Sequence, residues 1–461
     1  MQSKEASGYT RPLNGGPNKL SVQHMKNLAY FWNKLLETFW FIPVLIIFLA
    51  IVLATGLVKL DNSITITHEG LLRFFLVNSS DSARSILSTI SGAMIGVAGT
   101  VFSVTLVALT LASSQFGPRL IQNFMYVRLN QIVLGSYVAT YLYCLLVLNT
   151  IRDIDSYTFI PSISIIVSII AAVINIILLI VFIHRIAVSI QADKVIADIS
   201  NFITKQVEVL FPEKIGEESE MDSVDIQVKK SVYPHRIPIK SPKSGYLEYI
   251  SSDSLLEQIS KHDGLMELYH RPGSFLVKGI QLGELYVHER WEEDEIRKLV
   301  RQFVISTTKT ARQDLEYSIH QMVEIAARAL SPGVNDPYTA IACIDNLTST
   351  MSHLAEVKFP SRYRYDEEGD LRIIVDPLDF EGVLDAAFNQ IRQFSAGSTA
   401  VIIRLMEALI MIQAFTKIAS HKKAVIKHAQ MALTLGVQTI KEENDVADLR
   451  ERAEKILPQN V

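Results

Sequence analysis

The stretch TFWFIPVLIIFLAIVLATGLVKL, Thr38 to Leu60, decides the fold, because it is a long apolar run. Its only charged residue, Lys59, stands next to its end. A helix of about 20 apolar residues crosses a bilayer core of about 30 Å. The sequence therefore predicts an α-helical integral membrane domain of four transmembrane helices over residues 38–186. The three further runs of similar length and polarity are Ser85 to Ser113, Gln131 to Leu148 and Ile160 to Ile186.

Basic residues indicate how these helices are oriented. The first run follows a polar tail, residues 1–37, without a clear small-residue cleavage site, so we expect a retained anchor and not a signal peptide. The tail and the loop after the second run are basic, whereas the other two loops are less so. By the positive-inside rule, both termini are expected to be cytoplasmic. The basic positions are Lys4, Arg11, Lys19, Lys26, Lys34, Arg119 and Arg128.

Composition narrows the class of protein. The chain has 461 residues, 49% of them hydrophobic, and a net charge of −4. This is too apolar for an ordinary cytosolic enzyme, and without a basic run the charge argues against a nucleic-acid partner. Cys144 lies in the third apolar run and Cys343 in the C-terminal half, so no disulfide framework is expected. The lipid bilayer is the partner that composition predicts.

The C-terminal half reads as a mixed α+β cytosolic domain. We expect a connecting helix and an acidic linker over 187–222, a small β-rich domain over 223–290, and a mainly helical domain over 291–461. The β-rich part carries the short strand-like runs VDIQV, GYLEYI, LMELY, SFLVKG and GELYV between Gly and Pro residues. In the helical part, RYRYDEEGDLRIIV predicts a β-hairpin inserted at about 362–376.

Part of the β-rich stretch resembles the barrel-sandwich hybrid of biotinyl and lipoyl domains. Those domains carry a modified lysine at a hairpin tip, where this chain has SDSLLEQIS without a lysine. We therefore expect a structural or interaction module without carrier chemistry. The resemblance rests on the placement of Gly245, Gly264, Gly273, Gly279 and Gly283.

Apolar residues at steps of three and four predict helices in the remaining cytosolic part. One helix is expected from Asp314 to Leu330, and another after Asp379, a plausible N-cap. Further helices are expected at about 400–420, 422–436 and 441–456. The expected core residues are Leu315, Ile319, Met322, Ala326 and Ala329 in the first, and Phe380, Val383, Leu384, Ala387, Phe388, Ile391 and Phe394 in the second.

The segment ALSPGVNDPYTA, Ala329 to Ala340, interrupts this pattern. We expect a helix to end at Leu330 because Pro332 follows and Gly333 can adopt positive φ, and a new helix to start at Asn335 or Asp336 with Pro337 in its first position. A structural corner is the favoured interpretation. A ligand-binding turn stays open, because free N–H groups at a helix start attract anions, although Asp336 would compete with them. The turn comprises Ser331, Pro332, Gly333, Asn335, Asp336 and Pro337.

The longer segment DLEYSIHQMVEIAARALSPGVNDPYTA resembles the signature of a widespread bacterial family of uncharacterised predicted membrane proteins, grouped as a domain of unknown function. SARSILSTISGAMIGVAGTVFSVTLVALTLASSQFGPRL and DFEGVLDAAFNQIRQFS support the resemblance. It implies four spans and a cytosolic domain in the bacterial inner membrane, and it supplies no activity. The family pattern has Pro, Gly and Arg where this chain has Leu315, Ser318 and His320, so no role is expected of His320.

Enzyme and metal chemistry find little support in the sequence. Glu316, His320, Glu324 and Arg328 share one helix face, which favours a solvated row of ion pairs over a metal site. No Ser-His-Asp or Cys-His arrangement and no phosphate-binding glycine loop is readable. We therefore expect neither an enzyme nor a cofactor.

The second apolar run carries a stripe of small and hydroxyl residues. Such a stripe packs helices closely in lipid or, around a symmetry axis, lines a pore whose hydroxyls solvate an ion. The central portions of the spans lack charged residues, which favours a passive pore over active transport, and Asn175, Tyr137, Thr140 and Tyr141 are expected to bond between helices. The stripe comprises Ser88, Gly92, Gly96, Gly99, Ser103, Thr110 and Ser114.

The leading hypothesis is a homo-oligomeric, channel-like membrane protein with a cytosolic assembly or gating domain and a small ion or ligand as possible partner. The alternative is a membrane-anchored scaffold or sensor that conducts nothing.

Overall fold

The computed structural model divides the chain into two compact units. The first comprises Met1–Ser113 and Leu120–Val188, and the second comprises Ser114–Arg119 and Ser189–Val461. The basic N-terminal tail, Arg119 and the acidic linker expected at Pro212 to Asp222 lie outside the described residues. The structure describes residues 38, 40–63, 79–117, 128–154, 157–189, 191–210, 226–311, 313–357 and 359–457.

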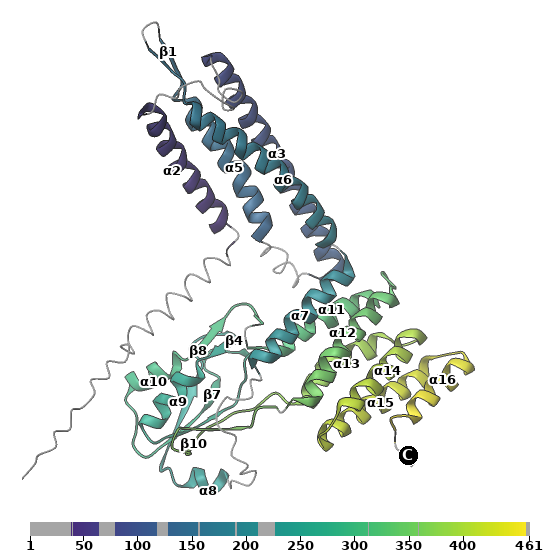
Figure 1. The fold of residues 1–461 in the computed structure, drawn as a ribbon. Coiled ribbons are helices and arrows are strands. Elements are labelled where there is room, and N and C mark those ends of the chain that lie inside the picture. Colours follow the sequence, from purple (N-terminus) through teal and green to yellow (C-terminus); the bar gives the residue numbers. More distant parts are fainter. Residues whose placement is uncertain are drawn as a thin grey trace, which may run out of the picture. The chain divides into compact units, whose positions relative to one another are not determined.

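Within its described residues, the first unit contains four helices that are long and apolar enough to cross a membrane, as the sequence predicts. They lie side by side in Figure 1. A short hairpin of β1 (Arg152–Ile154) and β2 (Tyr157–Phe159) precedes the last of them. The helices are α2 (Phe41–Ser63), α3 (Ser80–Phe116), α5 (Arg128–Leu148) and α6 (Ser162–Ser189).

Two apolar clusters hold these four helices together. One is built around the buried residues Ala54, Leu87, Cys144 and Ile165, which come from α2, α3, α5 and α6 in turn. The other joins α3, α5 and α6 through Met94, Ala98, Val101, Val133, Tyr137 and Phe182.

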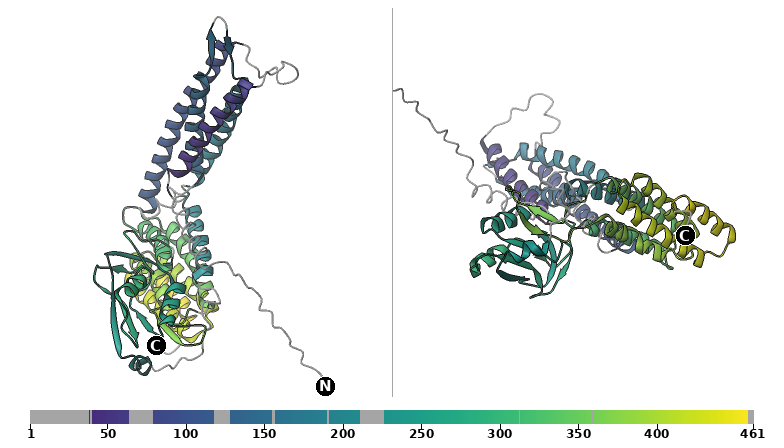
Figure 2. Two further views of the ribbon diagram at one scale, coloured as in Figure 1. Left: turned by 90° about the vertical axis from the view of Figure 1, so that its left-hand side faces the viewer. Right: turned by 90° about the horizontal axis from the view of Figure 1, so that it is seen from below.

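The helices of the second unit pack in neighbouring pairs. α7 lies against α11 and α12, α12 against α14, and α15 against α13, α14 and α16. Figure 2 shows this helical part beside the sheets of the same unit. The side chain of Ser318 in α11 donates a hydrogen bond of 2.6 Å to Gln206 of α7. These helices are α7 (Ala192–Leu210), α11 (Leu315–Ala329), α12 (Pro337–Glu356), α13 (Phe380–Phe394), α14 (Thr399–Phe415), α15 (Ala419–Thr439) and α16 (Glu443–Glu454).

The predicted core positions of α11 are buried, and so are those of α13 except Phe394, which is 47% exposed. Phe394 is the last residue of α13.

Two sheets form the β-rich part of the second unit. Three short helices accompany them, α8 (Ile226–Ser231), α9 (Ser252–Lys261) and α10 (Glu293–Val300). The smaller sheet has the order β6 (Phe275–Leu276), β4 (Gly245–Ile250), β8 (Phe303–Ser306). The larger has the order β3 (His235–Lys240), β7 (Gln281–Val287), β5 (Leu265–Leu268), β10 (Leu371–Ile374), β9 (Tyr363–Tyr365).

Two expectations for this part are wrong. Residues Ile226–Ser231 form α8, where VDIQV indicated a strand. The stretch SDSLLEQIS forms α9 and not a hairpin tip, because Leu255 and Ile259, one helical turn apart, are both buried. The hairpin predicted at about 362–376 is confirmed, because β9 and β10 pair antiparallel between α12 and α13. β10 also pairs in parallel with β5, so the hairpin extends the larger sheet.

Candidate functional site

The predicted stripe on α3 lies on the exposed face of that helix. Ser88, Gly92, Gly96, Gly99, Ser103, Thr110 and Ser114 are all exposed in the single chain. A Cβ atom placed on Gly92, Gly96 or Gly99 would meet no atom of another described residue within 4 Å, apart from its chain neighbours and the backbone of its own helix. The buried positions of α3 fall elsewhere around the helix, at Ala83, Leu87, Met94, Ala98 and Val101.

Within the described residues of the first unit, the glycine at which two helices pack closely is Gly135 of α5 and not a glycine of the stripe. A Cβ atom placed on Gly135 of α5 would lie 2.9 Å from the Cα atom of Pro43, so α2 and α5 approach each other where Gly135 has no side chain. This is the small-residue contact typical of helices in lipid. The three glycines of the stripe make no such contact with the described residues of their own chain, so a packing role for them requires a surface outside this chain.

Polar groups inside the first unit bond to one another, as the sequence predicts. The buried side chain of Asn175 in α6 donates to the hydroxyl of Thr140 at 2.8 Å and accepts from Ser136 at 2.6 Å. The hydroxyl of Tyr137 donates to the backbone carbonyl of Asn175 at 2.7 Å. Tyr141 is half-buried against the second apolar cluster. These bonds join α5 to α6 and satisfy groups that would be costly to leave unpaired in lipid.

The signature turn has the predicted helix boundaries. α11 is capped at Leu330, and α12 begins at Pro337 with Asp336 as its N-cap. The Asp336 carboxylate accepts from the backbone N–H of Thr339 at 3.1 Å and from its hydroxyl at 2.5 Å. The hydroxyl bond of Thr339, followed by backbone bonds, lowers the pKa of Asp336 below its ordinary value. The carboxylate is thus engaged in the cap.

The residue with positive φ is Asn335, at 49°, so the expectation for Gly333 is wrong. The N–H groups of Val334 and Asn335 both bond to the carbonyl of Ser331, at 3.0 and 2.9 Å, so the chain continues to coil past Gly333. It reverses only at Asn335, after which the N–H of Asp336 reaches the carbonyl of Ala329 at 2.8 Å. Asparagine tolerates the left-handed region better than most residues.

The row Glu316, His320, Glu324 and Arg328 contributes to contacts within the second unit. Glu316 pairs with Arg271 at 2.9 Å, and Arg328 donates to the backbone carbonyl of Ser114, which belongs to the same unit. Among the residues that the structure describes, no group of three or more His, Cys, Asp or Glu side chains is placed to hold a metal ion. Cys343 is buried, and burial raises the pKa of its thiol.

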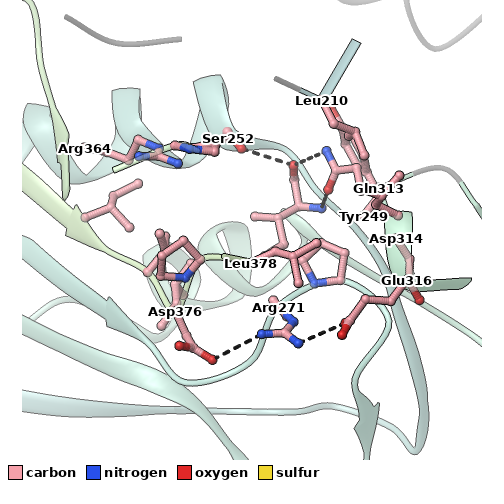
Figure 3. A pocket seen from close by; sticks show the side chains of 18 of the residues that line it. Leu210, Tyr249, Ser252, Arg271, Gln313, Asp314, Glu316, Arg364, Asp376 and Leu378 are labelled. Atoms are coloured by element: carbon pink, nitrogen blue, oxygen red, sulfur yellow. Dashed lines mark hydrogen bonds and ion pairs between the residues drawn. The ribbon is translucent and has the colours of Figure 1, made fainter. Parts of the chain in front are cut away.

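The sequence did not reveal a cavity of about 1210 Å³ in the second unit. Its wall combines residues of α7, β4, α9, β5, α11, α12, β9 and β10 with the segments that adjoin them. Figure 3 shows Arg271 between Glu316 and Asp376, 2.9 and 3.8 Å from their carboxylates. No local pattern connects these residues, since they come from three separate parts of the chain.

Asp314 is the most deeply buried acid of this wall, with 4% of its surface exposed. Its Oδ1 caps α11 by accepting from the N–H of Tyr317 at 3.0 Å, whereas Oδ2 is buried without a hydrogen-bond partner in the described structure. Among the described residues, Lys309 forms an ion pair with this carboxylate, with Nζ 3.7 Å from Oδ2. Burial is the main cause that raises the pKa of Asp314.

A smaller cavity of about 350 Å³ is also lined by Asp314, Arg271, Glu316 and Asp376. Gly273 is part of its wall, with φ at 93°, and a Cβ atom there would overlap Oδ2 of Asp314. A side chain at Gly273 would therefore displace the Asp314 carboxylate.

Comparison with known proteins supplies a family and no activity. The family model described as "Predicted membrane protein (DUF2254)" matches residues 36–411. Uncharacterized proteins of Mycobacterium tuberculosis and Mycobacterium bovis are each 30% identical over 374 residues, which cover 79% of this chain and 70% of the relative. No solved structure matches the chain significantly.

Proposed function

The chain belongs to the DUF2254 family of predicted membrane proteins, and we propose that it acts in the bacterial inner membrane as a homo-oligomeric, channel-like protein. In this proposal the α3 helices of several copies surround a common axis, and the second unit serves as the assembly or gating part.

The observation that carries the proposal is the exposed stripe of α3. Lipid tails pack well against large apolar side chains, whereas small residues on a helix surface in lipid are typical of contacts between helices. Nothing described in the chain lies within 4 Å of a Cβ atom placed on Gly92, Gly96 or Gly99. A second copy of α3 is the surface that fits a helix face made of glycine, serine and threonine.

The hydroxyls favour a pore over plain packing. Ser103 and Thr110 are exposed on this face. Thr110 uses its hydroxyl proton to donate to the carbonyl of Leu106 at 2.9 Å, and its oxygen can still accept. Oxygen atoms around an axis can replace part of the hydration shell of an ion. The charged residues of the described spans stand near their ends, at Lys59, Arg84 and Arg128 for example, which favours passive conduction over proton-coupled transport.

Orientation and partners complete the proposal. Both termini are placed in the cytoplasm on the strength of the positive-inside rule. The partners are the lipid bilayer, further copies of the chain, and a small ion or ligand, with no nucleic acid, cofactor or catalytic residue. The second candidate is a scaffold or sensor that conducts nothing, in which the same stripe only packs helices.

Ion flux from the purified protein in liposomes tests conduction. Ser103→Ala and Thr110→Ala should change flux or ion selectivity while the mass of the oligomer stays constant, because hydrogen bonds between membrane helices average only about 0.6 kcal/mol. Ser91→Ala is the matched control, since Ser91 is on the buried side of the same helix. If the wild type gives no flux above empty liposomes across voltage, tension and pH, the scaffold replaces the channel.

Mass in detergent tests assembly separately. Gly96→Leu should disrupt the oligomer, because a large side chain prevents close approach of two α3 helices. Gly56→Leu is the matched control, since Gly56 of α2 is exposed and also has nothing within 4 Å of an added Cβ atom. An unchanged mass for Gly96→Leu would show that the stripe is not the interface.

A further inference from the structure

Among the residues that the structure describes, the wall of the cavity in the second unit carries more acidic than basic side chains. Arg271 is already paired with Glu316 and Asp376, and Arg364 donates to the backbone carbonyls of Ser361 and Tyr363. Both guanidinium groups are therefore engaged within the protein. The described charged residues of the wall are Glu208, Asp253, Asp314, Glu316, Glu356 and Asp376 against Arg271 and Arg364, and Lys309 lies 3.7 Å from Oδ2 of Asp314.

Two buried oxygen atoms in this wall have no hydrogen-bond partner among the described residues, Oδ2 of Asp314 and the hydroxyl of Tyr365. Buried polar atoms in folded proteins are almost always satisfied by protein or by another molecule. The Asp314 oxygen is the more informative of the two, because a carboxylate can only accept. Lys309 forms an ion pair with this oxygen at 3.7 Å, which is too long for a hydrogen bond, so the oxygen still lacks a donor among the described residues. A positively charged donor gives the shorter and stronger bond.

The rest of the wall is largely apolar. Leu256, Leu268, Val375 and Leu378 line the cavity, and Tyr249 adds an aromatic ring. Binding cavities that take small molecules combine such apolar surfaces with a few polar groups that fix the orientation. A volume of about 1210 Å³ accommodates a small organic molecule with space to spare.

We propose that this cavity binds a small organic cation, whose ammonium group is held by Asp314 and Glu316 and whose hydrocarbon body lies against the leucine and valine side chains. The site goes beyond the proposed function, because binding here does not depend on whether the protein conducts ions. Glu316 remains able to accept from the ligand while it pairs with Arg271, since a carboxylate has about four acceptor positions.

Three small molecules that share a cyclohexane ring and differ in their polar group test the proposal on the full chain in nanodiscs. These are cyclohexylmethylamine, cyclohexylmethanol and cyclohexanecarboxylate at neutral pH, measured by calorimetry with empty nanodiscs subtracted. The amine should bind at least about tenfold more tightly than the alcohol, and the carboxylate should be weakest. Equal binding of amine and alcohol would overturn the proposal, and so would tightest binding of the carboxylate, which would indicate an anion site at Arg271.

Asp314→Asn locates the site. Asparagine caps a helix about as well as aspartate, so Oδ1 still accepts from Tyr317 while the unpaired oxygen becomes an amide NH₂. The preference for amine over alcohol should then disappear, and Glu316→Gln should weaken it. Asp336→Asn is the matched control, because it removes the same charge from the N-cap of α12 outside the cavity. Loss of the preference in this control, or its survival in Asp314→Asn, would refute the assignment.

Discussion

The carboxylate of Asp61, near the end of α2, accepts hydrogen bonds from the backbone N–H and the hydroxyl of Ser164, at 3.0 and 2.6 Å, in the first turn of α6. It also accepts from the N–H of Ile163 at 2.9 Å. One helix thus supplies the N-terminal cap of another that follows later in the chain. The first N–H groups of a helix have no partner within that helix. Asp61 accepts from two of them in α6, and this contact joins α2 to α6.

Removal of this cap should destabilise the first unit. We expect Asp61→Ala to cost about 0.5 to 2 kcal/mol of stability, the usual range for a lost N-cap, and to lower the midpoint of thermal unfolding in nanodiscs. Asp61→Asn, which keeps an acceptor oxygen, should lose less. Asp81→Ala removes an exposed acid from the first turn of α3 and serves as the control. A loss as large for Asp81→Ala would mean that charge and not the cap stabilises the unit.

The topology can be tested with single cysteines. Ser79→Cys, before α3, should react with a membrane-impermeant maleimide applied from outside, whereas Lys441→Cys should react only after the membrane is opened. Both native cysteines, Cys144 and Cys343, are buried, so the background should be low. The opposite labelling pattern would invert the proposed orientation.

The signature turn should depend on Asn335 and not on Gly333. Asn335→Val should cost about 1 to 3 kcal/mol, because a β-branched residue is strained at φ of 49°, whereas Asn335→Gly should be tolerated. Gly333→Ala should change little, since an added Cβ atom meets nothing within 4 Å and the φ angle is not positive. Chemical denaturation followed by circular dichroism gives the comparison. A larger loss for Gly333→Ala than for Asn335→Val would contradict this account.

Acid should destabilise the second unit through His428. This side chain is 1% exposed, and its Nε2 lies 2.9 Å from Oδ1 of Asp385. Burial lowers its pKa from 6.5, and this effect outweighs the attraction of Asp385. The unfolded chain therefore takes up a proton below about pH 6.5 that the folded chain resists, so stability present above pH 6.5 is lost as the pH falls. His428→Gln should flatten this dependence in thermal melts from about pH 7.5 to about pH 5, and an unchanged slope would exclude His428 as its cause.

Arg372 should be the most sensitive residue of the hairpin. Its guanidinium, 8% exposed, bonds at 2.5 Å to the buried Asp366 and at 2.5 Å to Asp263, next to β5. Removal of one partner from a buried ion pair costs about 3 to 5 kcal/mol, so Arg372→Ala should destabilise the second unit by that order. Asp370 is a largely exposed partner, 3.3 Å from Arg372. Asp370→Asn should therefore lower the stability by at most about 1 kcal/mol. Equal losses for the two variants, measured by denaturation, would disprove the role of burial.

Local signals in the sequence were sufficient for the long helices, but not for the short helices α8 and α9. Apolar runs give the four spans because a bilayer sets a minimum length, and the caps at Asp336 and Asp379 follow from the residues on either side. Where two residues compete for one conformation, local signals fail. Both Gly333 and Asn335 tolerate positive φ, and only the hydrogen bonds to Ser331 and Ala329 determine that Asn335 adopts it.

Long-range relations could not be read in the same way. The stripe of α3 was visible in the sequence, but its exposure depends on which side of α3 packs on α5 and α6, as seen for Met94 and Ala98. The parallel pairing of β10 with β5 and the cavity around Asp314 join segments that are distant in the chain. An orphaned carboxylate oxygen is a property of the assembled wall and has no signature in the residues next to Asp314.

The position of β10 in the larger sheet also determines how late in biosynthesis that sheet can be completed. β10 lies beside β5, but the ribosome makes it only after α11 and α12 have been completed. Until then one edge of β5 has no strand to pair with, and an open edge invites pairing with another chain. The larger sheet therefore cannot be completed until β10 has been synthesised. A fragment that ends after β8 would keep this edge of β5 unpaired. We therefore expect truncated proteins that contain the β-rich part but end before Ile374 to aggregate, and those that extend past Ile374 to stay soluble.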